Sequence, residues 1–600
     1  MKIDKEQLAY YERELQYLRK SGAEFARQHP KVASSLGLTP TSSSDPQVER
    51  LIESFAFLTS TLQRKYDDQF PTFSQTMLGV LYPQLVAPIP PMSIAQFDID
   101  PSKGKSTTGQ TIARGSNLYV QTDKGVPCRF QSCYDLTLWP LSVADVRITP
   151  AANYDFRDSF CPYPYVLRIR LKTQAKKLQE YDIRSLCFYI DADHFIANWM
   201  FECLFLENNT YATYNPAQES HRIMRGEEIV ERVGFKEEEM VLPTYPQAPS
   251  SFNLIQEYFA LPQKFMFFRL NQLDFSGCDD EVDLLIPMTS YDDSLKKNLQ
   301  ITTDSIKLGC TPVVNFFTHL TDPIDFNKRA LFYPLTADVQ KQRYMEIHTV
   351  EEVHQTIRGS KDVKKLSPYF SYDHGDVTNQ QNYFYHLQQN PAIDSPGTKT
   401  EISFVDLGFN KQTPKHETIY AKVKCTNRDL AHSLRPGTRL YGEKPLPVSQ
   451  VSLITQPTAS IYNPGSGNYH WQLISQLTTD YVILGAKDND VAVKVVKESI
   501  NVFKRQVSHA MMTDGSDIMR FSTHDIVRRI GRDAWRGFLN GAAYHITFSE
   551  ASYAKKDVMG FSAVLDHYFK NFSYTVSFTE LSVFKPDEEK VWKVWPVQKI

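Results

Sequence analysis

The stretch "YYERELQYLRK" at residues 10–20 is the centre of a segment in which an apolar position recurs every three or four residues. That spacing is typical of a helix that packs lengthwise against another helix. Burying one leucine or phenylalanine side chain gains roughly 1.5–3 kcal/mol, so a stripe of such residues is unfavourable in water. We name this stripe the seam, and it consists of Leu8, Tyr11, Leu15, Leu18, Gly22 and Phe25.

The residues around the seam predict where its helix begins and ends. Asp4 suits the N-cap, and Gln7 follows three residues later, as in a capping box. Ile3 and Leu8 occupy the positions of a hydrophobic staple around that cap. No proline follows until Pro30, so the predicted helix is roughly 36 Å long at about 1.5 Å per residue.

Two more helices are predicted after the first one. Asp45 and Pro46 suit an N-cap and a first helical position, and Pro71 ends the helix that they begin. Its predicted broad apolar face consists of Val48, Leu51, Ile52, Phe55, Leu58, Leu62 and Tyr66. A shorter helix is expected at 73–82, and "PQLVAPIPP" at 83–91 predicts a stiff, extended linker. The three helices could pack on one another, or a partner could cover the seam, because periodicity does not distinguish the two.

From about residue 92 the pattern changes to short strands. Apolar and polar residues alternate around Ile169, Ile419, Ile546 and Val576, which is typical of antiparallel strands with one face in water. Helical patches at 251–259 and 560–572 interrupt the strands. We therefore predict an α+β fold with a helical N-terminal region followed by several β-rich domains with antiparallel sheets. The expected boundaries are 1–90, 91–390 and 400–600, with a turn-rich loop at 388–400.

Composition limits the classes of function. The chain has 600 residues, enough for several domains, and its formal net charge of −3 gives no global attraction to nucleic acid or acidic lipid. No signal peptide or apolar run of 18 residues is visible, and the eight cysteines are scattered without a CxxC pair. A protein of the reducing cytoplasm with free thiols is expected.

Short motifs give little support for catalysis. "GKST" at 104–107 resembles the end of a phosphate-binding loop, but Ile99 stands where that loop needs a glycine. Cys128 and Cys133 lack further ligands at zinc spacing, and "DADH" at 191–194 predicts a wet loop after a strand. We predict no catalytic, cofactor-binding or metal-binding residues.

The motif blocks resemble one family along nearly the whole chain. They include "YYERELQYLRKSGAEFARQHP" at 10–30, "DPQVERLIESFAFLTSTLQRKY" at 45–66, "EYFALPQKFMFFRL" at 257–270, "CTPVVNFFTHLTDPI" at 310–324, "CTNRDLAHSL" at 425–434 and "GFSAVLDHYFKNFSYTVSFTEL" at 560–581. In this order they resemble the TssF family, baseplate subunits of the bacterial type VI secretion system.

The resemblance implies a structural protein without enzymatic activity or cofactor. TssF-like proteins pair with a second copy and with TssG to form a baseplate wedge. Such wedges carry TssE, contact TssK, and surround the VgrG spike beneath a membrane complex. The implied location is the cytoplasm, with recruitment to the inner membrane through that complex, and no nucleic acid or small-molecule substrate is expected. The seam would then be covered by helices of the second copy and of TssG.

Two other classes of function stay open at this point. One is a β-rich carbohydrate-active enzyme, which predicts a deep pocket with convergent carboxylates. The other is a nucleic-acid-binding module that uses the basic stretch "RRIGRDAWRG" at 528–537, in particular Arg528, Arg529, Arg532 and Trp535.

Overall fold

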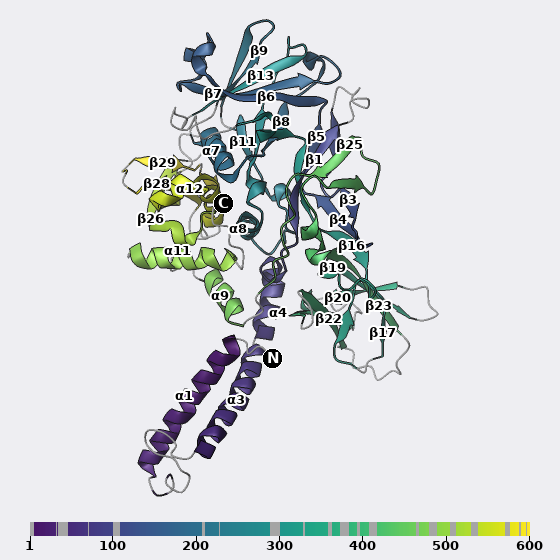
Figure 1. Ribbon diagram of the computed structural model, residues 1–600, viewed down its shortest axis with the longest axis vertical. Coiled ribbons are helices and arrows are strands. Elements are labelled where there is room, and N and C mark those ends of the chain that lie inside the picture. The colour runs from purple at the N-terminus through teal and green to yellow at the C-terminus, as the bar shows by residue number, and fades with distance from the viewer. Residues whose placement is uncertain are drawn as a thin grey trace. The chain divides into compact units, whose positions relative to one another are not determined.

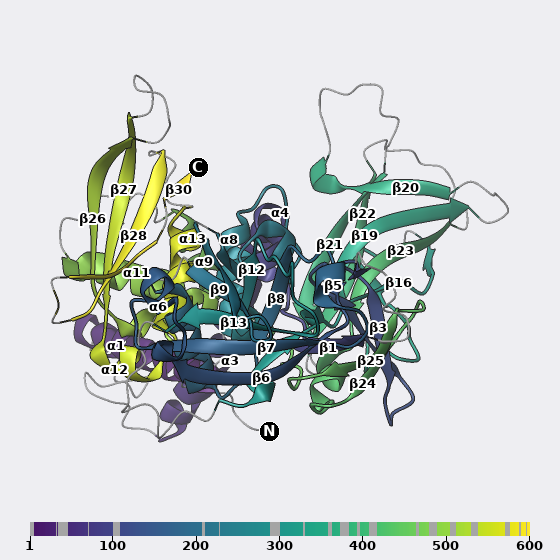
Figure 2. The ribbon, with the colours of Figure 1, turned by 90° about the horizontal axis from the view of Figure 1, so that it is seen from above.

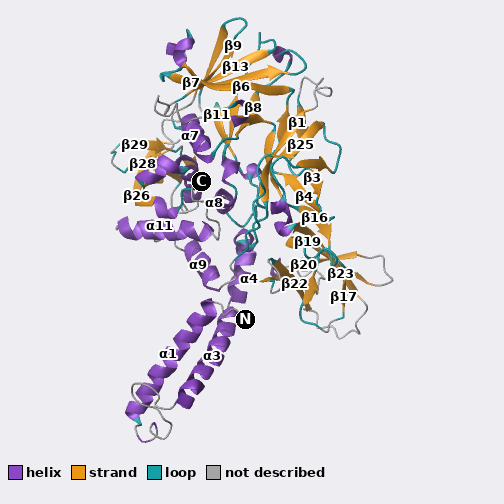
Figure 3. Ribbon diagram, in the orientation of Figure 1, coloured by secondary structure: helices purple, strands orange, loops and turns teal. Residues whose placement is uncertain are grey.

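The chain forms two compact units in its computed structural model. The helical unit comprises Met1–Val80 with Pro464–Leu477, and the β-rich unit comprises Leu81–Asn463 with Thr478–Ile600. Figure 3 shows helices in the first unit, and all the described strands lie in the second. The structure describes residues 5–29, 31, 33, 46–69, 71–99, 109–206, 210–226, 228–288, 301–327, 330–357, 363–371, 383–392, 397–406, 417–463, 467–478, 489–504, 512–529, 538–570, 577–586, 588, 590–595 and 597–599.

The helical unit confirms the three helices expected near the N-terminus. Its helices are α1 (Lys5–Gln28), α3 (Pro46–Gln69), α4 (Pro71–Leu81, which ends one residue into the β-rich unit) and α9 (Gly467–Thr478). Helices α1 and α3 lie side by side (Figure 1). The prolines at the start of α3 and α4 occupy the first helical turn, where a missing N–H costs no hydrogen bond. The predicted N-caps Asp4 and Asp45 lie outside the described residues.

A short helix replaces the first part of the expected extended linker. Helix α5 covers Pro83–Val86, so the prediction of an extended segment is wrong there. Pro83 is the first residue of α5, and its fixed φ is compatible with a helical turn. Beyond it, Ile89 forms an isolated antiparallel bridge with Ile461.

A closed antiparallel barrel is one element of the β-rich unit. Its strands follow the order β1 (Met92–Ile99), β15 (Cys310–Val314), β4 (Pro127–Ser132), β3 (Asn117–Gln121), β24 (Arg439–Gly442) and β25 (Val448–Leu453). Phe97, Leu118, Phe130 and Val313 are among the residues that fill it. Residues from three distant parts of the chain therefore share one core.

Three smaller sheets are formed by segments that lie between the barrel strands β1 and β15 in the sequence. The five-stranded sheet has the order β10 (Ser220–Arg225), β9 (Thr210–Asn215), β13 (Glu281–Pro287), β7 (Tyr165–Thr173) and β6 (Leu141–Pro150). The four-stranded sheet has the order β11 (Val230–Val233), β12 (Phe267–Asn271), β8 (Ser185–Ile190) and β14 (Ile306–Leu308). Strands β2 (Gln110–Ile112) and β5 (Leu136–Leu138) form a pair, and helices α6 (Arg157–Phe160) and α7 (His194–Phe205) belong to this region.

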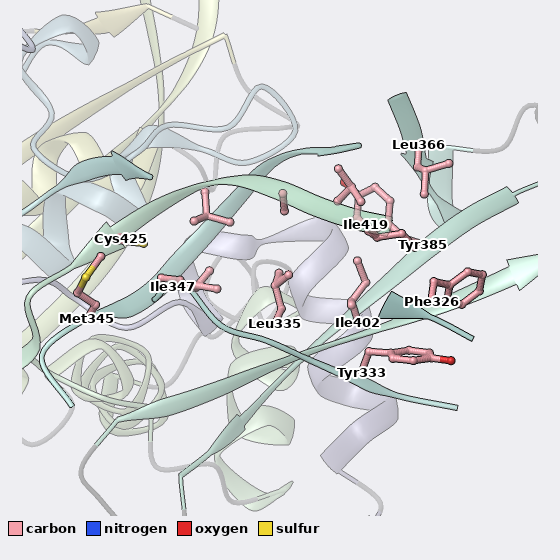
Figure 4. Close-up of a cluster of buried hydrophobic side chains, with 14 of the residues drawn as sticks. Phe326, Tyr333, Leu335, Met345, Ile347, Leu366, Tyr385, Ile402, Ile419 and Cys425 are labelled. Carbon is pink, nitrogen blue, oxygen red and sulfur yellow. The ribbon is translucent and has the colours of Figure 1, made fainter. Parts of the chain in front are cut away.

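An eight-stranded sheet has its own core. Its order is β16 (Phe317–Leu320), β23 (Glu417–Thr426), β19 (Glu346–Ile357), β20 (Val363–Pro368), β21 (Tyr383–Pro391), β22 (Thr398–Asp406) and β18 (Tyr333–Leu335), with β17 (Ile324–Phe326) paired to β23. Figure 4 shows Ile347 and Ile419 from one part of the sheet in the same cluster as Ile402 and Tyr385 from the other. The alternation predicted around Ile419 is confirmed, since β23 alternates buried and half-buried residues.

The C-terminal sheet contains the longest parallel pairing among the described strands. It consists of β26 (Ile518–Arg529), β27 (Phe538–Phe548), β28 (Phe578–Phe584), β29 (Val591–Val594) and β30 (Gln598–Lys599). Strands β26, β27 and β28 lie next to one another (Figure 2). Strands β27 and β28 are parallel because helices α12 (Glu550–Lys555) and α13 (Val558–Phe569) provide the crossover between them. Helix α11 (Asn489–Lys504) precedes this sheet.

A buried ion pair anchors helix α8 (Ser250–Ala260) in the β-rich unit. Glu257 accepts hydrogen bonds from the backbone N–H groups of Val241 (2.8 Å) and Leu242 (2.7 Å), and its other oxygen contacts the ammonium of Lys264. Both charged side chains are fully buried. A buried charge needs such partners, so Glu257 links α8 to Val241 and Leu242 before the helix and to Lys264 after it.

Candidate assembly interface

Helices α1 and α3 form an antiparallel hairpin. Arg19 Nε donates a hydrogen bond to Glu49 Oε1 at 2.9 Å, and two turns earlier on α1 the ring of Tyr11 lies 6.5 Å from that of Phe57. Moving back along α1 therefore means moving forward along α3, which defines the antiparallel direction. The chain itself thus covers part of its N-terminal seam.

Most of the seam residues of α1 are at least half-buried. Tyr11, Leu15, Leu18 and Gly22 are half-buried, and the next buried position on that side is Ala26. Leu8 and Phe25, at the two ends of the seam, are 45% and 37% exposed. A heptad spacing drifts by about 20° per heptad around a straight helix, so the ends of the seam turn away from the contact line.

Helix α3 exposes most of the apolar face that the sequence predicts. Its buried positions include Ala56 and Ser60, whose small side chains allow close approach of a neighbouring helix. Leu58 follows Ala56 by two residues, which places it about 200° away around the helix. Four large side chains on that other side are 60–68% exposed, and we name them the α3 stripe: Leu51, Phe55, Leu58 and Leu62.

The α3 stripe has the spacing of a helix-packing surface. Its members follow one another at intervals of 4, 3 and 4 residues, as a and d positions do. Exposed apolar side chains are common when single, but a contiguous row of four marks an interaction surface. The sequence analysis named only the seam as a partner-binding surface, so the exposed α3 stripe is an additional candidate surface on the same hairpin.

The other motifs singled out in the sequence have structural roles where they are described. Asp191 pairs with Lys307 at 2.6 Å, and the Asp193 side chain caps α7 by accepting a hydrogen bond from the Phe195 N–H at 3.1 Å. Arg528 pairs with Glu580 at 2.7 Å, so its charge is already matched. The motif at 104–107, as well as Arg532 and Trp535, lies outside the described residues.

The cysteines are free thiols, as expected, and seven of the eight are buried. Burial raises the pKa of the Cys128, Cys133 and Cys187 thiols to about 12. A thiol with such a pKa is a poor nucleophile and a poor metal ligand near neutral pH. Within the described ranges, no three His, Cys, Asp or Glu side chains gather where they could hold a metal ion.

A polar cleft lies beside the barrel. It measures about 590 Å³, and its lining includes Asp98, Asp135, Asp304 and Trp139. Burial raises the pKa of Asp98, an effect that Lys307 opposes, while Asp135 accepts a hydrogen bond from the backbone N–H of Arg114 at 2.8 Å. This cleft contains the residue types that a carbohydrate-active enzyme uses, carboxylates and an aromatic ring.

Comparison with known proteins agrees with the resemblance in the sequence. The chain matches the family model "Type VI secretion system, TssF" over residues 3–599. Type VI secretion system component TssF1 of Pseudomonas aeruginosa is 28% identical over 607 residues, which cover 96% of this chain and 95% of that protein. None of the helices that the structure describes has the length and apolarity needed to cross a membrane.

Two solved structures have a similar fold. A chain in the cryo-electron microscopy structure of the type VI secretion system TssK-TssF-TssG baseplate subcomplex matches with a TM-score of 0.72 and 22% identity, over 92% of this chain and 98% of that one. A chain in the structure of the type VI secretion baseplate complex matches with a TM-score of 0.60 and 21% identity, over 99% of both.

The full-length matches define a component of a bacterial type VI secretion system. Within that class, the chain belongs to the TssF family. The resemblance that the motif blocks predict is thereby confirmed.

Proposed function

We propose that this chain is a structural, non-catalytic wedge subunit of the type VI secretion baseplate. It pairs with a second copy of itself and with TssG through the α1–α3 hairpin. Membership of the TssF family supports this role, as does the likeness of its fold to chains from assemblies that contain TssK, TssF and TssG. The observation that carries the proposal is the α3 stripe, because its four large side chains are solvent-exposed in the single chain.

The wider assembly follows from the same role. The wedge contacts TssK, carries TssE and surrounds the VgrG spike, so that it forms a platform on which the sheath assembles and contracts. It works in the cytoplasm and is recruited to the inner membrane through the membrane complex. Large, apolar interfaces suit a subunit that must stay bound while its assembly changes shape.

Co-expression with TssG and TssK from the same genome tests the proposal. The test variant combines Leu58→Arg with Leu62→Arg, which places two charges on the α3 stripe. The matched control combines Glu12→Gln with Gln16→Arg, which makes the same change of net charge at exposed positions of α1 outside the seam and the α3 stripe. We expect a complex with two copies of this chain per TssG, measured by native mass spectrometry after affinity purification.

The stripe variant should recover at least tenfold less TssG than the wild type, while the control variant should recover a normal amount. Each leucine loses the roughly 1.5–3 kcal/mol of its burial, and each arginine adds the cost of burying a charge. Normal recovery of TssG by the stripe variant would contradict the assignment of this surface.

A further inference from the structure

A groove of about 690 Å³ opens on the β-rich unit, where loops from the barrel and the eight-stranded sheet meet. Lys124 reaches it from the turn between β3 and β4, Arg343 from the turn before β19, and Lys399 from β22. Its described lining is Lys124, Gln342, Arg343, Tyr344, Ala392, Lys399, Asn427, Arg428, Asp429 and Leu430. Four of these residues are cationic and one is acidic, so the groove is electropositive.

Two of the cations lie over one aromatic ring. Lys124 Nζ lies 5.4 Å from the centre of the Tyr344 ring, and Arg343 Cζ lies 5.9 Å from it. Both cationic side chains are exposed, and neither forms an ion pair with a carboxylate of the described residues. Arg428 differs, because it interacts with the buried carboxylate of Glu346. The charge available to a ligand therefore centres on Lys124 and Arg343.

The wall of the groove is held in a strained conformation. Arg428 has a φ of +51°, a left-handed value that costs a residue other than glycine on the order of 1–3 kcal/mol. The preceding residue, Asn427, is 1% exposed, and its side chain accepts hydrogen bonds from Arg129 N–H (3.0 Å) and from the Asn315 amide (3.0 Å). It also donates to the Tyr344 carbonyl at 3.4 Å. Strain supported by a buried network is characteristic of preorganised sites.

We infer that this groove binds an acidic segment of another protein. Its volume suits several residues of an extended chain, and its exposed cations are complementary to carboxylates. A nucleic acid fits less well, since stacking of successive bases needs several aromatic rings and Tyr344 is the only aromatic residue of the described lining. Two cations already lie over its ring. The inference does not depend on the α1–α3 hairpin.

Fluorescence anisotropy with the full chain tests this inference. The probe is fluorescein-labelled decaglutamate, compared with labelled decaglutamine and a labelled ten-nucleotide thymidine oligonucleotide, at low and at physiological salt. The test variant combines Lys124→Glu with Arg343→Glu. The control combines Lys364→Glu with Lys494→Glu, two exposed lysines outside the groove that give the same change in charge.

We expect decaglutamate to bind the wild type more tightly than either comparison probe, with weaker binding as salt rises. The groove variant should bind it at least tenfold more weakly, and the control variant within twofold of the wild type. Thermal unfolding should be unchanged in both variants, because all four side chains are exposed. No measurable binding to the wild type, an equal loss in the control, or tighter binding of the oligonucleotide would each overturn the inference.

Discussion

At the scale of single residues, this protein contains charged groups deep in its β-rich unit. Glu257 and Lys264 are both fully buried, and their sequence block shows only two ordinary charged residues seven positions apart. Sequence patterns do not reveal such pairing, since a charge is normally expected at the surface. Because these two charges are buried away from water, the loss of either one would leave the other buried without a counter-charge.

The substitution Lys264→Met should destabilise the β-rich unit by about 3–5 kcal/mol, because it leaves the Glu257 carboxylate buried without its counter-charge. Denaturant unfolding monitored by tryptophan fluorescence measures this, since five of the six tryptophans lie in that unit. The double variant Glu257→Gln with Lys264→Met should recover most of the loss. A single variant as stable as the wild type would show that the pair contributes little.

Asp557 gives a pH-dependent prediction. Its side chain caps α13 by accepting a hydrogen bond from the Gly560 N–H at 2.7 Å, and burial raises its pKa from 3.8 to about 6. The folded state therefore holds this proton to higher pH than the unfolded state. As a result, the contribution of this carboxyl to stability falls as pH rises from about 4 to 6.

The variant Asp557→Asn keeps the capping oxygen and removes the titration. Its free energy of unfolding minus that of the wild type should grow between pH 4 and pH 6 and level off above, with a rise on the order of 1–3 kcal/mol. Denaturant unfolding at half-unit pH steps checks this. A difference independent of pH would contradict the buried, protonated state of Asp557.

At the scale of elements, the sequence predicts where helices lie better than it predicts which elements pack against them. Prolines and heptad spacing give the approximate bounds of α1, α3 and α4. The same spacing could not show that α1 meets α3 near Glu49 and Phe57 while the α3 stripe stays exposed, because hydrophobic periodicity does not distinguish which side of a helix meets which neighbour. The parallel pairing of β27 with β28 was also not visible. The alternation around Ile546 predicted a half-buried antiparallel strand, which is wrong on this side of β27, because β27 pairs in parallel with β28 and both strands are mostly buried; Val576 lies outside the described residues.

The seam itself can be tested separately from the stripe. Leu15→Arg combined with Leu18→Arg should disrupt the α1–α3 hairpin and abolish co-purification with TssG, because both leucines are half-buried there. Circular dichroism at 222 nm should lose helical signal, while the tryptophan-monitored unfolding of the β-rich unit stays unchanged. A retained complex at normal yield would count against the seam.

At the scale of the whole molecule, the two units combine segments that are distant in sequence. Residues 464–477 belong with the N-terminal helices, and the groove combines Lys124 with Arg343 and Lys399. No local pattern predicts such groupings, because they depend on how the chain folds back over hundreds of residues. The family resemblance was visible earlier because its motif blocks occur in order along the chain.

A chain that starts at residue 81 tests whether the units are independent. We expect it to keep the unfolding transition of the β-rich unit, because the barrel and the other sheets lie entirely within that unit. It should fail to recover TssG, since it lacks the hairpin. Tryptophan fluorescence and affinity purification measure the two effects, and loss of the unfolding transition would contradict this division.

The discontinuity of the helical unit also has a consequence for biosynthesis. Helix α9 is encoded about 400 residues after the hairpin, and ribosomes add roughly 5–20 residues per second. The nascent hairpin therefore waits for roughly 20–80 seconds before its last helix emerges. Leu51, Phe55, Leu58 and Leu62 are exposed throughout that time, and they stay exposed in the complete chain. During that interval it is a substrate for chaperones and for any subunit translated nearby, so the order of translation bears directly on whether the chain assembles or aggregates.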